Sequence, residues 1–197
     1  MTWWNLSKSG AKVDRVLSSA ELRRPKASRD AFLALPRRPI TVVLDGVVQN
    51  YNIGAIFRLC DAFLVERLVI CGIMVELRKR KLVQAARGTQ RWVPWERVEN
   101  PVTAVAAAKS AGAWVVAVEQ TSGGNSPEDL APAFPACVVL GSEMRGVSQE
   151  IVDIADAAAT IPMLGMVNSI NVAAAAAIVL YRLSVLLDRR LRPAASN

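Results

Sequence analysis

The stretch IPMLGMVNSINVAAAAAIVLY, from Ile161 to Tyr181, belongs to a run of 25 residues, Ala157–Tyr181, that contains no Asp, Glu, Lys or Arg. A run of this length is sufficient to span a bilayer. Asn168, Ser169 and Asn171 interrupt it, however, and in lipid each of these polar groups would need an internal partner. The pattern therefore favours a strand end, a polar loop and a buried helix, without a membrane span.

Short apolar segments alternate with segments of helical spacing along the rest of the chain. The expected strands are 38–47, 67–72, 113–120, 136–141 and 159–163, and the expected helices are 52–65, 100–112, 148–158 and 171–191, preceded by one or two short helices in 11–35 that break at Pro25. Asn52 and Ser148 are expected to cap their helices. Apolar strands that alternate with helices predict an α/β fold, with a mostly parallel sheet flanked by helices.

Three segments rich in polar residues and glycine, 45–52, 141–147 and 164–171, follow expected strands. In parallel sheets the ligand crevice lies beyond the carboxyl ends of the strands. No G-x-G-x-x-G follows the first strand and no Walker A motif is present, which excludes ordinary dinucleotide and P-loop sites. The chain also lacks histidine, which excludes a Ser-His triad and a histidine general base.

The net charge is +7, and the basic residues are clustered. Residues 1–39 hold nine Lys and Arg against three Asp and Glu, and residues 67–97 hold eight against two. Clustered positive charge attracts polyanions, although a basic run can also be only a solvated face. Trp92 and Trp95 lie within the second cluster, and exposed tryptophan beside arginine suits unstacked bases. The residues expected to contact RNA are Arg78, Lys79, Arg80, Lys81, Arg87 and Arg91.

The three cysteines, Cys60, Cys71 and Cys137, have no metal-ligand spacing and stand among apolar residues. We expect them to be buried free thiols and expect no metal site. The first residues lack the basic-then-apolar order of a signal peptide, so the expected location is cytoplasmic.

The segments NYNIGAIFRLCDAF (50–63), VVLGSEMRGVS (138–148) and Ile161–Tyr181 resemble, in this order and spacing, the three motifs of the SpoU/TrmH family. These are RNA ribose 2′-O-methyltransferases of the SPOUT superfamily, and the match covers roughly residues 40–185. The resemblance implies a deep trefoil knot in the C-terminal part, which periodicity does not predict because knots are very rare. It also implies S-adenosylmethionine as cofactor and a homodimer with the active site near the subunit interface.

The resemblance implies that Arg58 is a catalytic residue. Arg58 lies about 150° from the apolar stripe of its helix, so it faces away from the core. A guanidinium is a poor base because its pKa exceeds about 12. We therefore expect Arg58 to bind a phosphate of the RNA, orient the ribose hydroxyl and stabilise the transition state. The other residues that match the family's catalytic positions are Asn52, Glu143, Ser169 and Asn171.

The cofactor site implied by the resemblance lies in the second and third motifs. A missing Cβ at Gly141 allows the backbone to approach the cofactor. Apolar side chains of the third motif can flank an adenine, and backbone amides can bond it. Asn171 can in addition cap the helix that follows. The expected cofactor-binding residues are Gly141, Ile161, Met163, Ser169, Ile170 and Asn171.

The expected organisation is a basic helical extension (1–39), a methyltransferase domain (40–192) and a short tail (193–197). The last helix has too many apolar residues for one buried face, which adds to the expectation of a homodimer. These residues are Ile178, Val179, Tyr181, Leu183, Val185, Leu186 and Leu187.

The expected activity is methylation of a ribose 2′-OH in structured RNA, with tRNA favoured over rRNA because short arms suit a compact substrate. The extension matches no known substrate-binding domain, so the nucleotide is left open. One alternative is a base methyltransferase of the same superfamily, which the Asn52–Arg58 and Ser169–Asn171 signatures disfavour. Another is a catalytically idle RNA-binding protein that retains the knotted scaffold, which the intact motif residues disfavour.

Overall fold

The computed structural model describes residues 16, 18 and 29–191 of the 197-residue chain. The backbone divides into two compact units, Met1–Pro36 and Arg37–Asn197. In the first unit the structure describes a short helix, α2 (Arg29–Leu33). The helical prediction for residues 11–28, with its break at Pro25, and the tail at 193–197 lie outside the described residues.

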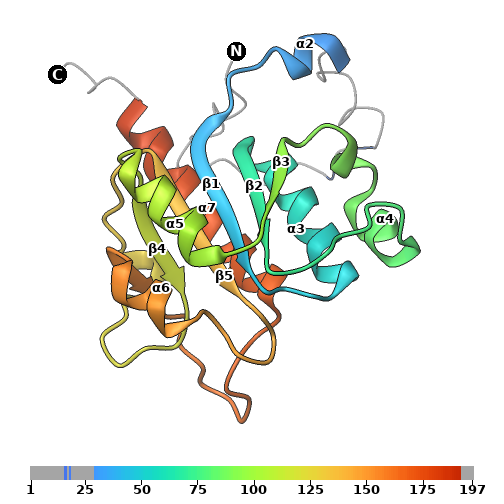
Figure 1. The fold of residues 1–197 in the computed structure, drawn as a ribbon. Helices are drawn as coiled ribbons and strands as arrows, with labels where there is room; N and C mark the ends of the chain where they lie inside the picture. The colour runs from blue at the N-terminus through green and yellow to red at the C-terminus, as the bar shows by residue number, and fades with distance from the viewer. Residues whose placement is uncertain (1–15, 17, 19–28, 192–197) are drawn as a thin grey trace, which may run out of the picture. The chain divides into compact units, whose positions relative to one another are not determined.

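The second unit is built on one parallel sheet of six strands in the order β3-β2-β1-β5-β4-β6 (Figure 1). β1 and β5 pair in register from Ile40 opposite Ala136 to Asp45 opposite Gly141. The connection after β1 leads to β2 on one side of this pair, and the connection after β5 leads to β6 on the other side. The carboxyl ends of β1 and β5 therefore form a topological switch point. The predicted parallel α/β fold is therefore confirmed. The strands are β1 (Arg38–Asp45), β2 (Val65–Cys71), β3 (Trp95–Val98), β4 (Trp114–Val118), β5 (Ala136–Gly141) and β6 (Ala157–Ala159).

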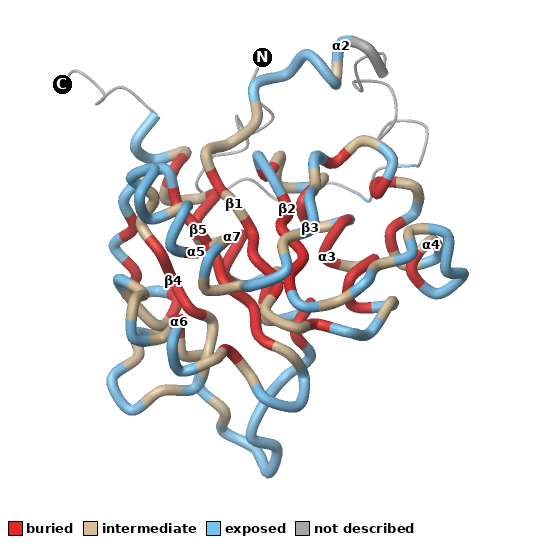
Figure 2. Tube along the Cα trace, in the orientation of Figure 1, coloured by how far each residue is buried: buried red, intermediate tan, exposed pale blue. Residues whose placement is uncertain are grey.

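Helices cover both faces of the sheet (Figure 1). The helices of this unit are α3 (Asn50–Ala62), α4 (Arg80–Ala86), α5 (Pro101–Ser110), α6 (Gln149–Ile154) and α7 (Val172–Leu191), with short 3₁₀ turns at Thr89–Arg91 and Pro127–Asp129. Successive strand residues point to opposite faces: Val42 joins the core under α3, α4 and α7, whereas Val43 joins the core under α5 and α6. Figure 2 shows the central strands buried between these two layers.

Several local expectations differ from the structure. The helix expected over 148–158 ends at Ile154, and residues 157–158 belong to β6. The last strand is Ala157–Ala159 and not 159–163, because Thr160 N donates to the carbonyl of Asn125, at 2.8 Å, in the loop after β4. α3 ends at Ala62 and does not continue to residue 65, because Leu64 adopts φ 52°, outside the helical region. β3 and α4 were not predicted, because both are short and carry exposed charged residues.

The cysteine prediction is confirmed: Cys60, Cys71 and Cys137 are free and buried. Burial raises the pKa of Cys71 and of Cys137 to about 12 and raises the pKa of Cys60 as well. The thiols are thus unreactive parts of the core. Within residues 16, 18 and 29–191, none of the helices combines the length and the apolar character that a membrane crossing requires.

Candidate functional site

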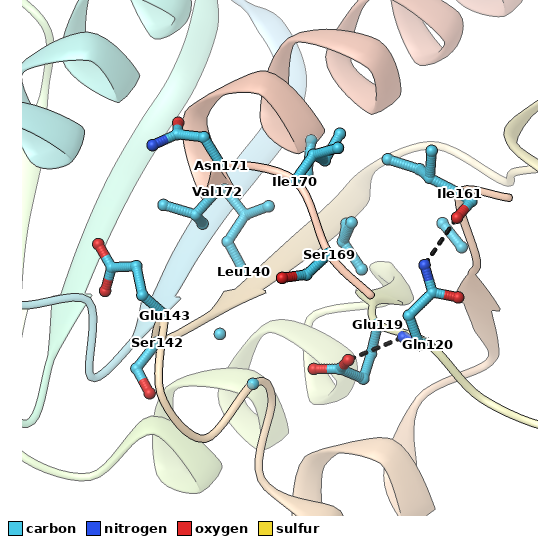
Figure 3. Close-up of a pocket in the computed structure, with 15 residues that line it drawn as sticks. Glu119, Gln120, Leu140, Ser142, Glu143, Ile161, Ser169, Ile170, Asn171 and Val172 are labelled. Carbon is cyan, nitrogen blue, oxygen red and sulfur yellow. Dashed lines mark hydrogen bonds between the residues drawn. The ribbon is translucent and has the colours of Figure 1, made fainter. Parts of the chain in front are cut away.

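A cavity of about 370 Å³ opens at the carboxyl ends of β4, β5 and β6 (Figure 3). This is the edge of a parallel sheet at which α/β proteins bind ligands, and pockets for small molecules span roughly 300–1,000 Å³. The lining residues come from the ends of the three strands and from the start of α7. They are Val118, Glu119, Gln120, Leu140, Gly141, Ser142, Glu143, Gly146, Ala159, Ile161, Ser169, Ile170, Asn171, Val172 and Ala175.

The loop after β5 is folded tightly onto its own first residue. Ser142 and Gly146 exchange backbone hydrogen bonds, with Gly146 N donating to Ser142 O at 2.9 Å. A Cβ on Gly141 would lie 2.0 Å from the carbonyl carbon of Gly146 and 2.1 Å from Val147 N. Gly141 must therefore be glycine because the loop's backbone approaches it closely.

A polar network joins the three motif segments beside the cavity. Asn52 is 1% exposed; its Nδ2 donates to Oε1 of Glu143, and its Oδ1 accepts a bond of 2.9 Å from Nδ2 of Asn171. A buried amide needs such partners, because an unsatisfied polar group in the interior is costly. The network thus links α3, the loop after β5 and the start of α7.

The same contacts decide two capping predictions. Asn171 Oδ1 accepts from Ala173 N at 2.9 Å, so Asn171 caps α7 as expected. The N-cap role of Asn52 is wrong: α3 begins at Asn50 after Gln49, and the Asn52 side chain is taken up by the network. Ser148 stands at the N-cap position of α6, but its side chain makes no capping hydrogen bond.

The expected cofactor residues largely line the cavity. Gly141, Ile161, Ser169, Ile170 and Asn171 are lining residues, whereas Met163 is not. The wall is fixed at Ile161, whose carbonyl accepts a hydrogen bond of 2.6 Å from Nε2 of Gln120. Met163 lies past Pro162, and its role stays a prediction.

Sequence reasoning missed Glu119 and Gln120, which follow β4 and line the cavity. Glu119 Oε2 accepts from Val147 N at 2.7 Å, and its Oε1 accepts from Gln120 N at 2.8 Å. Glu119 therefore ties the end of β4 to the loop after β5. A polar pair at the carboxyl end of a buried strand is the signal that could have identified both residues.

Arg58 is exposed on α3, while its neighbours Ile56 and Phe57 are fully buried. The side chain is accordingly directed away from the core of its own helix, as predicted. The described residues that line the cavity do not include Arg58.

The basic residues expected to contact RNA surround α4, and Arg78, Lys79, Arg80, Lys81, Arg87 and Arg91 are all exposed. Lys79 pairs with Glu76 at 3.2 Å. Trp92 and Trp95 are not the exposed tryptophans that the sequence suggested, because both are half-buried and pack against the core. Trp92 Nε1 donates to Oδ1 of Asp61 at 2.6 Å, and Trp95 packs edge-on against Phe57 with ring centroids 6.1 Å apart.

In the part of the chain that the structure describes, no three Cys, Asp or Glu side chains lie close enough together to hold a metal ion.

The comparisons with known proteins all match one protein family. The model of the SpoU rRNA Methylase family matches residues 39–181. The tRNA (guanosine(18)-2′-O)-methyltransferase of Aquifex aeolicus (strain VF5) is 36% identical over 146 residues, which are 74% of this chain and 68% of that protein. The crystal structure of the A. aeolicus TrmH/SpoU tRNA modifying enzyme aligns with a TM-score of 0.72 and 33% identity, over 84% of this chain and 85% of that one.

A further solved structure is the SpoU methyltransferase AviRb from Streptomyces viridochromogenes in complex with the cofactor AdoMet. It aligns with a TM-score of 0.67 and 26% identity, over 83% of this chain and 63% of that chain. The predicted enzyme class, an S-adenosylmethionine-dependent RNA methyltransferase, is thereby confirmed at the level of the family. With the family model matching most of its length, the chain belongs to the SpoU rRNA Methylase family.

Proposed function

We propose that this protein transfers the methyl group of S-adenosylmethionine to the 2′-hydroxyl of a ribose in tRNA. The observation that carries the proposal is the network of Asn52, Glu143 and Asn171, which joins the three motif segments beside the cavity. A network of this kind fixes side chains from three distant parts of the chain in one geometry, and fixed geometry is what methyl transfer to an oriented hydroxyl requires.

The residues of the cavity fit S-adenosylmethionine. Leu140, Ile161, Ile170 and Val172 give the cavity apolar walls for an adenine, and the hydroxyl of Ser169 faces the same space (Figure 3). When bound, this cofactor supplies an electrophilic methyl group, whose bond to sulfur breaks with the electron pair left on sulfur. Apolar walls with a few placed polar groups are typical of such sites.

Arg58 acts on the RNA side of the reaction in this proposal. Its exposure leaves the guanidinium available to a phosphate, which planar N–H groups can bind at two points. Arg58 would hold the adjacent ribose so that the hydroxyl oxygen meets the methyl carbon, while the hydroxyl proton passes to water. It would also stabilise the negative charge that develops on that oxygen.

Asn52, Glu143 and Asn171 have a positioning role in this scheme. Glu143 lies in the loop that lines the cavity, and its bond from Asn52 anchors that loop to α3, the helix that also carries Arg58. Asn171 anchors the start of α7 to the same point. The side-chain amide of Asn52 thus connects the wall of the cavity to α3, the helix that carries Arg58.

The preference for tRNA over rRNA rests on the A. aeolicus relative, which is named as a tRNA (guanosine(18)-2′-O)-methyltransferase. The same family membership supports a deep trefoil knot in the C-terminal part of this chain. A cytoplasmic location follows from the proposed substrate and cofactor.

The function is tested by incubating the purified protein with labelled S-adenosylmethionine and, separately, with total tRNA and rRNA, followed by nucleoside analysis. A 2′-O-methyl nucleoside in tRNA is the expected product. A methylated base would instead support the base methyltransferase, and cofactor and RNA binding without transfer would support an idle scaffold.

We also propose that the protein is a homodimer. On α7, Val179, Leu183 and Leu187 are buried in the core, but Ile178 and Tyr181 are 40% and 53% exposed. Together with Ala174 they stand at i, i+4 and i+7, which is one face of a helix. This face is apolar and uncovered in the single chain.

We expect a mass of two chains in solution at micromolar concentration, because that apolar face is more stable when covered. Changing Ile178 and Tyr181 together to aspartate is expected to give monomers, as measured by light scattering on a sizing column. Leu191→Asp, at an exposed position at the end of the same helix, is the control. A fully active wild-type monomer would contradict the proposal.

The basic residues around α4 are expected to carry much of the RNA affinity. Changing Arg78, Lys79, Arg80 and Lys81 together to glutamine should weaken RNA binding and flatten its salt dependence, by about 0.7–0.9 in slope for each phosphate that the variant no longer neutralises. Lys79 should contribute least, since Glu76 already pairs with it. Binding is measured over a range of salt concentrations, and an unchanged slope would mean that these residues are only a solvated surface.

Cofactor affinity is the control for this variant and should stay near the wild-type value, since none of the four residues lines the cavity.

A further inference from the structure

The charged residues that line the cavity are all acidic. Of its fifteen lining residues, Glu119 and Glu143 carry charge, and among these described residues none is Lys or Arg. This stands out in a chain whose net charge is +7. A recess lined by one sign of charge focuses the electrostatic field and concentrates ligands of the opposite sign.

Glu119 is held so that its charge acts on the cavity. Its two carboxylate oxygens each accept one backbone hydrogen bond, from Val147 N at 2.7 Å and from Gln120 N at 2.8 Å. A carboxylate offers about four acceptor sites, so these two bonds fix its orientation without saturating it. In Figure 3 the carboxylate is directed into the cavity on the side of Ser169.

Of the two carboxylates, Glu119 is the more shielded from water. Glu119 is half-buried, whereas Glu143 is exposed and already engaged with Asn52. Charges interact more strongly where water screens them less. The larger electrostatic effect on a ligand in the cavity is therefore expected from Glu119.

We propose that Glu119 makes this cavity select the cationic cofactor over its neutral product. The inference rests on the proposed function. S-adenosylmethionine carries a sulfonium charge, and S-adenosylhomocysteine, which has lost the methyl group and keeps the electron pair on sulfur, does not. The two molecules share every other group, so a carboxylate can discriminate between them only through that charge. Methyl transfer would thus remove the feature that the cavity favours and promote release of the product.

The test compares affinities by calorimetry for S-adenosylmethionine, S-adenosylhomocysteine and sinefungin, in which a carbon that bears an ammonium group replaces the methylated sulfur. Glu119→Gln is expected to weaken both cationic ligands by on the order of tenfold relative to the neutral one. Glu119→Asp keeps the charge and should keep most of the preference. Glu66→Gln, at an exposed position on β2, is the control for a change in net charge and should alter none of the three affinities.

An equal loss for all three ligands in Glu119→Gln would overturn the inference, because it would leave Glu119 only the task of holding the loop through Val147. Wild-type protein that binds none of the three would contradict the proposed function itself. A measurement without variants gives a second check. Added salt should weaken the wild-type affinity for the two cationic ligands more than that for S-adenosylhomocysteine, and equal salt effects would also overturn the inference.

Discussion

Replacing Arg58 with alanine is expected to lower the rate of methyl transfer by at least ~100-fold, the loss typical of removing one oriented transition-state interaction. The fold and the cofactor affinity should change little. Arg58 is exposed while Ile56 and Phe57 beside it are buried, and Arg58 does not line the cavity. The measurement is single-turnover methylation of the RNA substrate at saturating cofactor, with binding measured separately.

Arg58→Lys makes the test of Arg58 sharper. Lysine keeps the positive charge but lacks the planar fork that can hold a phosphate and a hydroxyl together, so it should restore little of the rate. Arg67→Ala removes another exposed arginine, which pairs with Glu96 at 3.0 Å, and should leave the rate near the wild-type value. If Arg58→Lys transfers methyl at close to the wild-type rate, Arg58 is only a point charge and the catalytic assignment must move elsewhere.

The central sheet was predictable because its strands are buried on both faces. β1 and β5 are continuous apolar segments that end at Asp45 and Gly141, so neither strand can be mistaken for a surface element. β3 was missed because it is a four-residue strand with two exposed charged residues. Nothing in its local pattern distinguishes it from a loop, and its pairing with β2 is a tertiary contact.

The candidate site was predicted in its residues but not in its contacts. Asn52 was expected to cap a helix, which is the most common role for an asparagine before an apolar stripe. Its partners, Glu143 and Asn171, are 91 and 119 residues away along the chain. Local spacing carries no information about such contacts, and the resemblance to a family indicated only that these residues matter.

The role of Glu119 at the site could not be predicted from local sequence either. Its residue type and its place after an apolar strand were visible, but the strand order that brings β4 beside β5 was not. Only that pairing places Glu119 within reach of Val147. The acidic character of the cavity is therefore a property of the fold and could not be predicted from the basic composition of the chain.

The steric requirement at Gly141 gives the second large prediction. Gly141→Ala places a methyl group 2.0 Å from the carbonyl carbon of Gly146, 2.1 Å from Val147 N and 2.3 Å from Gly146 O. All three are backbone atoms, so no side chain can rotate away to relieve the clash. The loop that carries Glu143 must move, which should break its bond to Asn52.

We expect Gly141→Ala to lower the free energy of unfolding by about 1–3 kcal/mol, the usual cost of inserting a methyl group into a packed site. Affinity for S-adenosylmethionine should fall by at least tenfold, which corresponds to roughly 1.4 kcal/mol, because the displaced loop forms one wall of the cavity. Denaturant unfolding measures the first effect, and calorimetric titration with the cofactor measures the second.

Gly123→Ala is the matched control, because a Cβ on Gly123 meets nothing within 4 Å. It makes the same chemical change in the loop after β4, and its effect on the free energy of unfolding should stay within about 0.5 kcal/mol. The comparison separates the effect of replacing a glycine from the effect of the steric clash at Gly141. The prediction is contradicted if Gly141→Ala has the same cofactor affinity and the same free energy of unfolding as Gly123→Ala. The loop after β5 could then move without destabilising the protein, and the close approach at Gly141 would not maintain the site.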